Sequence, residues 1–207
     1  MILADGTRTL TAAGRWNEAL AHIEKHDGIG LRMLDGRQVA VLAALSSDPG
    51  YAADLLAQTT PGEPWENAIT SCLTVMCHRA VRRPAHGLLS ELADTYVQRE
   101  PEIGITVFDT RLGLTVLDLC DQPDSHAAHL VAKQPNHQLR RRYAARECLM
   151  NTRFMALVSP EKERHKRDLL HACALESGEL PTPSAVRLRR ALRVSNRVIR
   201  RSVDRPQ

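Results

Sequence analysis

The stretch DGRQVAVLAALSSDPGYAADLLAQ, residues 35–58, decides the fold, because a second copy of it, DTRLGLTVLDLCDQPDSHAAHLVAK, occupies residues 109–133. With Asp124 treated as an insertion, eight positions are identical, where ordinary composition gives about two. The identical residues of the first copy are Asp35, Arg37, Leu45, Pro49, Ala52, Ala53, Leu55 and Ala57. The chain therefore contains an internal repeat, which indicates architecture more strongly than chemistry.

A shorter period of 34 residues runs through the first half of the chain. Ala19, Ala53 and Gly87 follow one another at this spacing, and all three are small. A small residue at a fixed position lets two helices approach closely. Sequence similarity that recurs about every 30 to 40 residues is typical of stacked helical hairpins. The spacing therefore predicts an array of such hairpins.

The segment LTAAGRWNEAL, residues 10–20, resembles the turn between the two helices of a tetratricopeptide (TPR) repeat, because Gly14, Trp16 and Ala19 keep that family's spacing. The resemblance implies an all-α fold, a TPR-like α-solenoid of about five helical hairpins plus a C-terminal helix. Similar arrays occur in actinobacterial regulators. By analogy, the resemblance implies a regulatory or scaffolding module that binds a protein or peptide and is not an enzyme.

Composition agrees with close-packed helices. The chain has 207 residues, of which 43% are hydrophobic but only 3% aromatic, so Ala, Leu and Val must form the core. The net charge of +4 is mild and does not by itself indicate nucleic-acid binding, which needs a concentrated basic patch.

The cysteines and the apolar runs indicate the cellular compartment of the protein. The five cysteines are an odd number without framework spacing, which predicts reduced core residues in a cytoplasmic protein. The N-terminal apolar run is interrupted by Asp5 and Arg8, and no run of 18 apolar residues occurs. These features predict a cytoplasmic location and no membrane partner.

Hydrophobic periodicity and turn residues predict where the hairpins lie. The expected helices cover residues 4–13, 15–26, 37–45, 51–58, 64–81, 85–98, 138–157 and 159–176. In the seventh of these, Tyr143, Leu149 and Phe154 are expected to point inward. Residues 103–108, IGITVF, are β-branched enough for a strand, but their place in the repeat favours a helix. The repeat domain is thus expected to cover residues 1–180.

The first helices of TPR-like hairpins line a concave groove that binds a peptide or a partner's helix. Polar residues expected on these helices are therefore candidate partner-binding residues. They are Arg37, Asn67, Thr70, Arg111, Arg142 and Arg146. Arginines in a groove would favour a ligand that carries a carboxylate, through two-pronged hydrogen bonds. The alternative is that these are solvated surface positions.

Residues 183–207 form a separate, basic unit. Within the segment AVRLRRALRVSNRVIRRSV, residues 185–203, Leu188, Leu192 and Ile199 line one side. The basic candidates on the other sides are Arg189, Arg190, Arg193, Arg197 and Arg200. Capping of the array is the favoured role, because repeat arrays need a polar end and no aromatic residue is interleaved for base stacking. The alternative is a basic helix that binds nucleic acid, acidic lipid or an acidic protein, with nucleic acid a weak candidate partner.

Chemistry-bearing motifs are sparse. His22 and His26 lie four residues apart on a predicted helix but have no evident third ligand, so no metal site is predicted. Cys77 and His78 are adjacent, which directs their side chains about 100° apart on a helix. No catalytic residue and no cofactor is predicted. Two alternatives stay open, namely a small-molecule binder or enzyme of specialised metabolism, and a homodimer formed through the uncapped N-terminal end.

Overall fold

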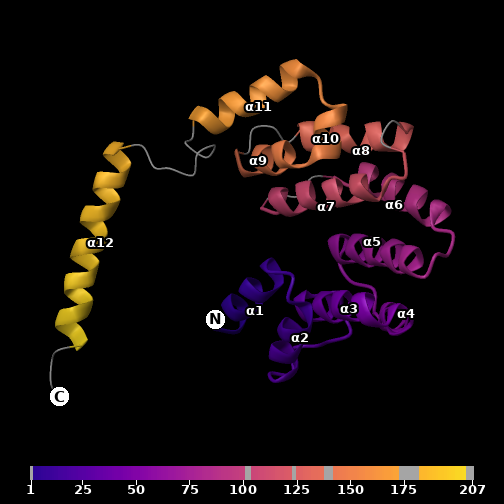
Figure 1. Cartoon of the computed structure of the whole chain (residues 1–207), viewed down its shortest axis with the longest axis horizontal. Coiled ribbons are helices and arrows are strands. Elements are labelled where there is room, and N and C mark those ends of the chain that lie inside the picture. The colour runs from indigo at the N-terminus through magenta and orange to yellow at the C-terminus, as the bar shows by residue number, and fades with distance from the viewer. Residues whose placement is uncertain (1, 101–103, 123–124, 138–141, 173–181, 204–207) are drawn as a thin grey trace.

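The computed structural model describes the chain except for residues 1, 101–103, 123–124, 138–141, 173–181 and 204–207. All regular structure within the described residues is helical, which confirms the all-α fold class (Figure 1). The helices are α1 (Ile2–Ala12), α2 (Trp16–Glu24), α3 (Asp35–Ser47), α4 (Pro49–Ala57), α5 (Pro64–Ala80), α6 (His86–Gln98), α7 (Thr106–Leu119), α8 (His126–His137), α9 (Arg142–Met150), α10 (Thr152–Leu157), α11 (Pro160–Ala172) and α12 (Thr182–Val203).

The helices pack mainly in sequential pairs. α1 contacts α2, α3 contacts α4, α5 contacts α6 and α7 contacts α8, while α9 packs on α11 with the short α10 between them in the chain. Each pair also contacts the next, through α2 and α3, α4 and α5, α5 and α7, and α7 and α9. The pairs therefore follow one another in a row from α1 to α11, and α12 stands apart from that row (Figure 1).

Side-chain contacts between neighbouring helix pairs connect the start of one first helix to the start of the next, and the end of one to the end of the next. Arg32, just before α3, forms an ion pair with the buried Glu66 in the first turn of α5. Arg79, near the end of α5, donates a hydrogen bond to the carbonyl of Leu119 at the end of α7. Because starts meet starts and ends meet ends, α3, α5 and α7 run in the same direction along the row.

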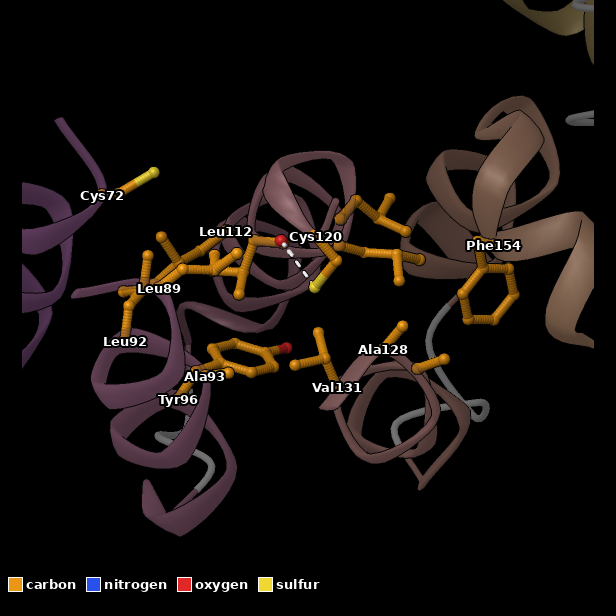
Figure 2. Close-up of a cluster of buried hydrophobic side chains, with 14 of the residues drawn as sticks. Cys72, Leu89, Leu92, Ala93, Tyr96, Leu112, Cys120, Ala128, Val131 and Phe154 are labelled. Atoms are coloured by element: carbon orange, nitrogen blue, oxygen red, sulfur yellow. Dashed lines mark hydrogen bonds between the residues drawn. The ribbon is translucent and has the colours of Figure 1, made fainter. Parts of the chain in front are cut away.

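α7 is the most enclosed of these helices, with eight of its 14 residues buried. Side chains from α6, α8 and α10 surround it (Figure 2). Its Gly113 faces the Tyr96 ring of α6 so closely that a Cβ atom there would lie 2.1 Å from the Tyr96 hydroxyl oxygen. That hydroxyl donates to the carbonyl of Asp109 at 3.1 Å, and burial raises the pKa of Tyr96. The absence of a side chain at Gly113 therefore lets α6 dock on α7.

The small residues at 34-residue spacing do not share one environment. Ala19 is fully buried in α2, whereas Ala53 is exposed. Gly87 is exposed too, and a Cβ atom there would meet nothing within 4 Å. The buried small residues of the same two helices are Ala52 in α4 and Ala93 in α6. The predicted close approach is therefore wrong at Ala53 and Gly87, because the face of α4 that packs inward also carries Leu55 and Leu56 and excludes Ala53.

The described part of the segment that could be read as a strand forms a turn at Gly104, followed by Ile105 and the start of a helix. α7 begins at Thr106, so residues 106–108 are its first turn, while residue 103 lies outside the described part. The hydroxyl of Thr110 donates to the carbonyl of Thr106 at 2.8 Å inside the core. Repeat context thus prevails over the local preference of β-branched residues for strands.

The seventh expected helix is interrupted, and this changes the environment of one predicted core residue. Asn151 ends α9 and caps α10, because its side chain accepts a hydrogen bond from the backbone N–H of Phe154 at 2.8 Å. Phe154 is fully buried as predicted, but Tyr143 is 62% exposed. The prediction that Tyr143 points inward is therefore wrong. α9 buries Ala144, Ala145 and Cys148 instead, and Tyr143 lies on the opposite side.

Candidate functional site

Arg37 does not line a groove, although its repeat position suggested that it would. It is only 4% exposed. Its Nη2 donates to the carbonyl of Leu55 at 2.6 Å, and its Nη1 and Nε lie 3.3 Å from the Gly30 carbonyl and the Thr59 hydroxyl. These bonds tie α3 to the end of α4 and to the preceding loop. The predicted partner-binding role of Arg37 is therefore wrong. Its guanidinium group already donates to acceptors of the protein itself, so the side chain holds the fold together.

Asn67 and Thr70 also bond to nearby backbone. The Asn67 amide both accepts from and donates to the backbone of Gly62, each at 3.1 Å. The Thr70 hydroxyl donates to the carbonyl of Glu66 at 3.0 Å. Asn67 is exposed and Thr70 half-buried. Both side chains therefore fix the start of α5 while lying at or near the surface.

Arg111 lies at the surface of α7 and holds an acidic partner from α9. Its Nε and Nη2 donate to the two carboxylate oxygens of Glu147 at 3.0 and 2.9 Å. Two turns further along α7, Asp118 accepts hydrogen bonds at 3.0 to 3.1 Å from the amide of Asn151, which lies about one turn beyond Glu147. α9 therefore runs alongside α7 in the same direction. A ligand carboxylate at Arg111 would have to displace Glu147, so the predicted open carboxylate site is not present in this form.

Beside these polar contacts between α7 and α9, which we call the polar seam, α9 exposes two large apolar side chains. Tyr143 is 62% exposed and Met150 is 73% exposed. They are seven residues apart, a spacing that places them on one helix face about 10 Å apart along the axis. Arg146 is also exposed, whereas the side chain of Arg142 lies outside the described part of the chain. We call this surface the α7–α9 face; it comprises Arg111, Thr115, Asp118, Tyr143, Arg146, Glu147 and Met150.

Tyr143 and Met150 were missed as surface residues because aromatic and apolar positions in a helix predict core. The sequence signal that indicates their exposure is the set of small residues, two alanines and a cysteine, on the other side of α9. Ala144, Ala145 and Cys148 already supply a complete buried face.

A separate cavity of about 600 Å³ opens between α1, α2 and α3. It is lined by Thr7, Arg8, Thr11, Trp16, Ile23, Gly28, Asp35, Gly36, Gln38, Val39 and Leu42. The charged residues among the described lining are Arg8 and Asp35, and both are exposed. The described lining includes neither a thiol nor a histidine that could act as nucleophile or base.

The described cysteines are buried and unpaired by disulfides, as predicted: Cys72, Cys77, Cys120 and Cys148. Cys173 lies outside the described residues. Burial raises the pKa of the Cys72 and Cys148 thiols to about 11. Because the thiolate is the reactive form, both thiols are inert at neutral pH.

The histidine pair of α2 is formed, with the rings of His22 and His26 5.4 Å apart edge to face. Among the described residues, no group of three His, Cys, Asp or Glu side chains could hold a metal ion. His78 directs its Nδ1 toward the carbonyl of Pro84 at 3.3 Å, while the neighbouring Cys77 is buried.

Lys166 of α11 is the most unusual buried group. Its side chain is fully buried, and its Nζ has no hydrogen-bond partner among the described residues. The amine lies 5.2 Å from the ring centroid of Phe154. Burial lowers the pKa of Lys166; the nearby Cys148 opposes this shift and Lys162 adds to it. The cation–π contact offsets only part of the cost of removing an ammonium group from water.

Replacing Lys166 by methionine is expected to raise the free energy of unfolding by about 1 to 3 kcal/mol at neutral pH, because a buried donor without a partner is removed. The native pKa is lowered, so the cost of the buried ammonium is fully present below that pKa. It disappears as the pH rises toward the ordinary lysine value of about 10.4. Urea unfolding at several pH values measures this. The gain should shrink at alkaline pH, and Arg164→Met, an exposed control on the same helix, should change little.

α12 carries the second candidate surface. Arg189, Arg190, Arg193 and Arg197 are exposed, and the side chain of Arg200 lies outside the described part. Leu188 and Leu192, expected to pack against the array, are 47% and 59% exposed. The described residues thus do not show the capping contact that the sequence favours.

Comparison of the chain with models of protein families, with curated proteins and with solved structures finds no match in any of the three. Among the described helices, none combines the length and the apolar character needed to cross a membrane.

Proposed function

We propose that the chain is a TPR-like α-solenoid that binds a protein or peptide partner and acts as a regulatory or scaffolding module in a bacterial cytoplasm. The observation that carries the proposal is the α7–α9 face. Its two exposed apolar side chains, Tyr143 and Met150, lie beside the ion pair of Arg111 and Glu147. A large exposed apolar group beside a polar seam is typical of an interaction site.

The arrangement of helices supports the repeat part of the proposal. Each helix pair packs mainly on its neighbours in the chain, as the units of a solenoid do. α3, α5, α7 and α9 run in the same direction, and in solenoids such helices line one continuous surface. The α7–α9 face would be one part of that surface.

The chemistry of the face indicates the kind of partner. Tyr, Met and Arg are enriched at protein interfaces, and apolar anchors contribute more binding energy than exposed ion pairs. The ion pair of Arg111 and Glu147 would therefore form the polar rim. Tyr143 and Met150, about 10 Å apart along α9, would contact apolar side chains seven residues apart on a partner helix, which is the spacing of two helical turns.

The test is affinity capture by the full chain from a nuclease-treated lysate of its own source. The double variant Tyr143→Ser with Met150→Ser is expected to recover at least about tenfold less of the specific partner than the unmodified chain, because anchors of this kind commonly contribute 2 kcal/mol or more, roughly, to binding. Quantitative mass spectrometry measures the recovery.

Tyr51→Ser is the matched control, because Tyr51 is 56% exposed but lies on α4, away from the α7–α9 face. It should leave the captured set unchanged. A chain shortened to residues 1–181 should also retain the partner. Equal recovery by the double variant, or capture that depends on residues 182–207 alone, would rule out the α7–α9 face as the binding surface.

A further inference from the structure

α12 holds an extreme concentration of positive charge. Its 22 residues include seven arginines and no acidic residue. The whole chain has 28 basic and 24 acidic residues, so the rest of the chain has 21 basic and 24 acidic ones. The positive net charge of the protein therefore resides entirely in this one helix.

The helix also separates its charges from its apolar side. At about 100° per residue, Ala185, Leu188 and Leu192 fall on one face. The described arginines fall on the other side: Arg187, Arg189, Arg190, Arg193 and Arg197. Leu188 and Leu192 are 47% and 59% exposed, and none of the described side chains of α12 is buried. Two chemically distinct faces are thus presented to solvent at once.

We propose that α12 binds along the surface of an anionic lipid bilayer. Such a surface matches both faces, because its phosphate groups attract the arginines while the boundary of the acyl chains takes up the leucines. Guanidinium groups form two-pronged hydrogen bonds with phosphate oxygens, and their apolar stems reach past the leucine side to the headgroups. The sequence predicts no membrane partner for the chain as a whole but leaves acidic lipid open as a ligand of this helix, and the proposal takes up that alternative.

Two other occupants match only one face each. A nucleic acid would pair with the arginines but leave Leu188 and Leu192 exposed to water, and α12 offers no aromatic side chain for stacking on bases. A second copy of α12 would cover the leucines, but the arginines of both copies would face away from the contact, without an acidic residue of α12 to pair with them. Charge and apolar exposure together therefore favour the lipid surface.

The test is flotation of the full chain with vesicles. Vesicles made of an equimolar mixture of phosphatidylglycerol and phosphatidylcholine are expected to bind the chain at least about tenfold more tightly than vesicles of phosphatidylcholine alone, and added salt should weaken the binding. A short DNA duplex is titrated in parallel. Weaker binding to the duplex than to the anionic vesicles supports the proposal.

Leu188→Ser with Leu192→Ser is expected to lower the affinity for anionic vesicles by roughly tenfold or more, because two leucines no longer enter the acyl boundary. Val186→Ser with Val194→Ser is the matched control. Both valines are exposed, at 56% and 55%, but lie among the arginines. This control should bind within about threefold of the unmodified chain. Since none of the described side chains of α12 is buried, neither variant should change thermal unfolding followed by tryptophan fluorescence.

Equal binding to both kinds of vesicle, tighter binding to the duplex, or full binding by the Leu188→Ser and Leu192→Ser variant would overturn the proposal. The lipid-binding proposal is independent of the proposed function, since α12 shares no residue with the α7–α9 face. The Tyr143→Ser and Met150→Ser variant should accordingly bind anionic vesicles like the unmodified chain.

Discussion

Truncating Phe154 to alanine is expected to lower the free energy of unfolding by about 3 to 5 kcal/mol. Phe154 is the largest of the fully buried side chains, and it belongs to the core cluster that surrounds α7 (Figure 2). Its removal leaves a cavity that α7 and α8 cannot close without losing their own contacts. It also takes away the ring beside the Lys166 amine, so that a buried ammonium loses its cation–π contact.

Urea unfolding followed by circular dichroism measures this cost. Met150→Ala is the control, because Met150 is a large apolar residue of the neighbouring α9 but is 73% exposed. Its expected change is within about 0.5 kcal/mol. If Phe154→Ala cost less than about 1 kcal/mol, the ring would not be the centre of this core.

Much of the fold follows from local sequence. Turn formers and prolines place the helix boundaries well. Asp48, for example, accepts hydrogen bonds from the backbone N–H groups of Gly50 and Tyr51 and so caps α4, whose first residue is Pro49. The repeat of residues 35–58 also predicts α7 correctly, since α3 and α7 begin within a few residues of Asp35 and Asp109. Capping and periodicity are properties of neighbouring residues, which a sequence records directly.

The candidate site was predicted less well because burial depends on distant neighbours. Arg37 and Arg111 are equivalent in the repeat, yet Arg37 is buried against Leu55 while Arg111 is exposed and bonded to Glu147. The helices around α3 differ from those around α7, so the two equivalent arginines have different surroundings. No local pattern connects Arg111 to a carboxylate 36 residues further on.

α12 shows the same limit in another form. Its two faces are plain from the spacing of leucines and arginines, but the same pattern fits a helix that caps an array and a helix that binds an external surface. The choice depends on whether anything covers Leu188 and Leu192. In the described structure both side chains are exposed.

Replacing Gly36 by alanine is expected to lower the free energy of unfolding by about 3 kcal/mol, the upper end of the usual cost of overpacking. A Cβ atom at Gly36 would lie 2.1 Å from the carbonyl oxygen of Gly28 and 3.2 Å from the Ile23 side chain. The nearest atom belongs to the backbone, so no side-chain rotation can relieve the clash. The loop after α2 would have to move away from α3.

The sign of the effect separates this close contact from ordinary helix propensity. Alanine normally stabilises a helix relative to glycine by up to about 1 kcal/mol, and Gly87→Ala in α6 should show that gain, because a Cβ atom there meets nothing within 4 Å. Gly36→Ala should show the opposite sign. Since repeat units are stabilised through their neighbours, the loss should be largest at α1 and α2, where the fluorescence of Trp16 reports it in a Trp65→Phe background. A gain at both glycines would mean that the first helix pair is not held against α3 by the contact between Gly28 and Gly36.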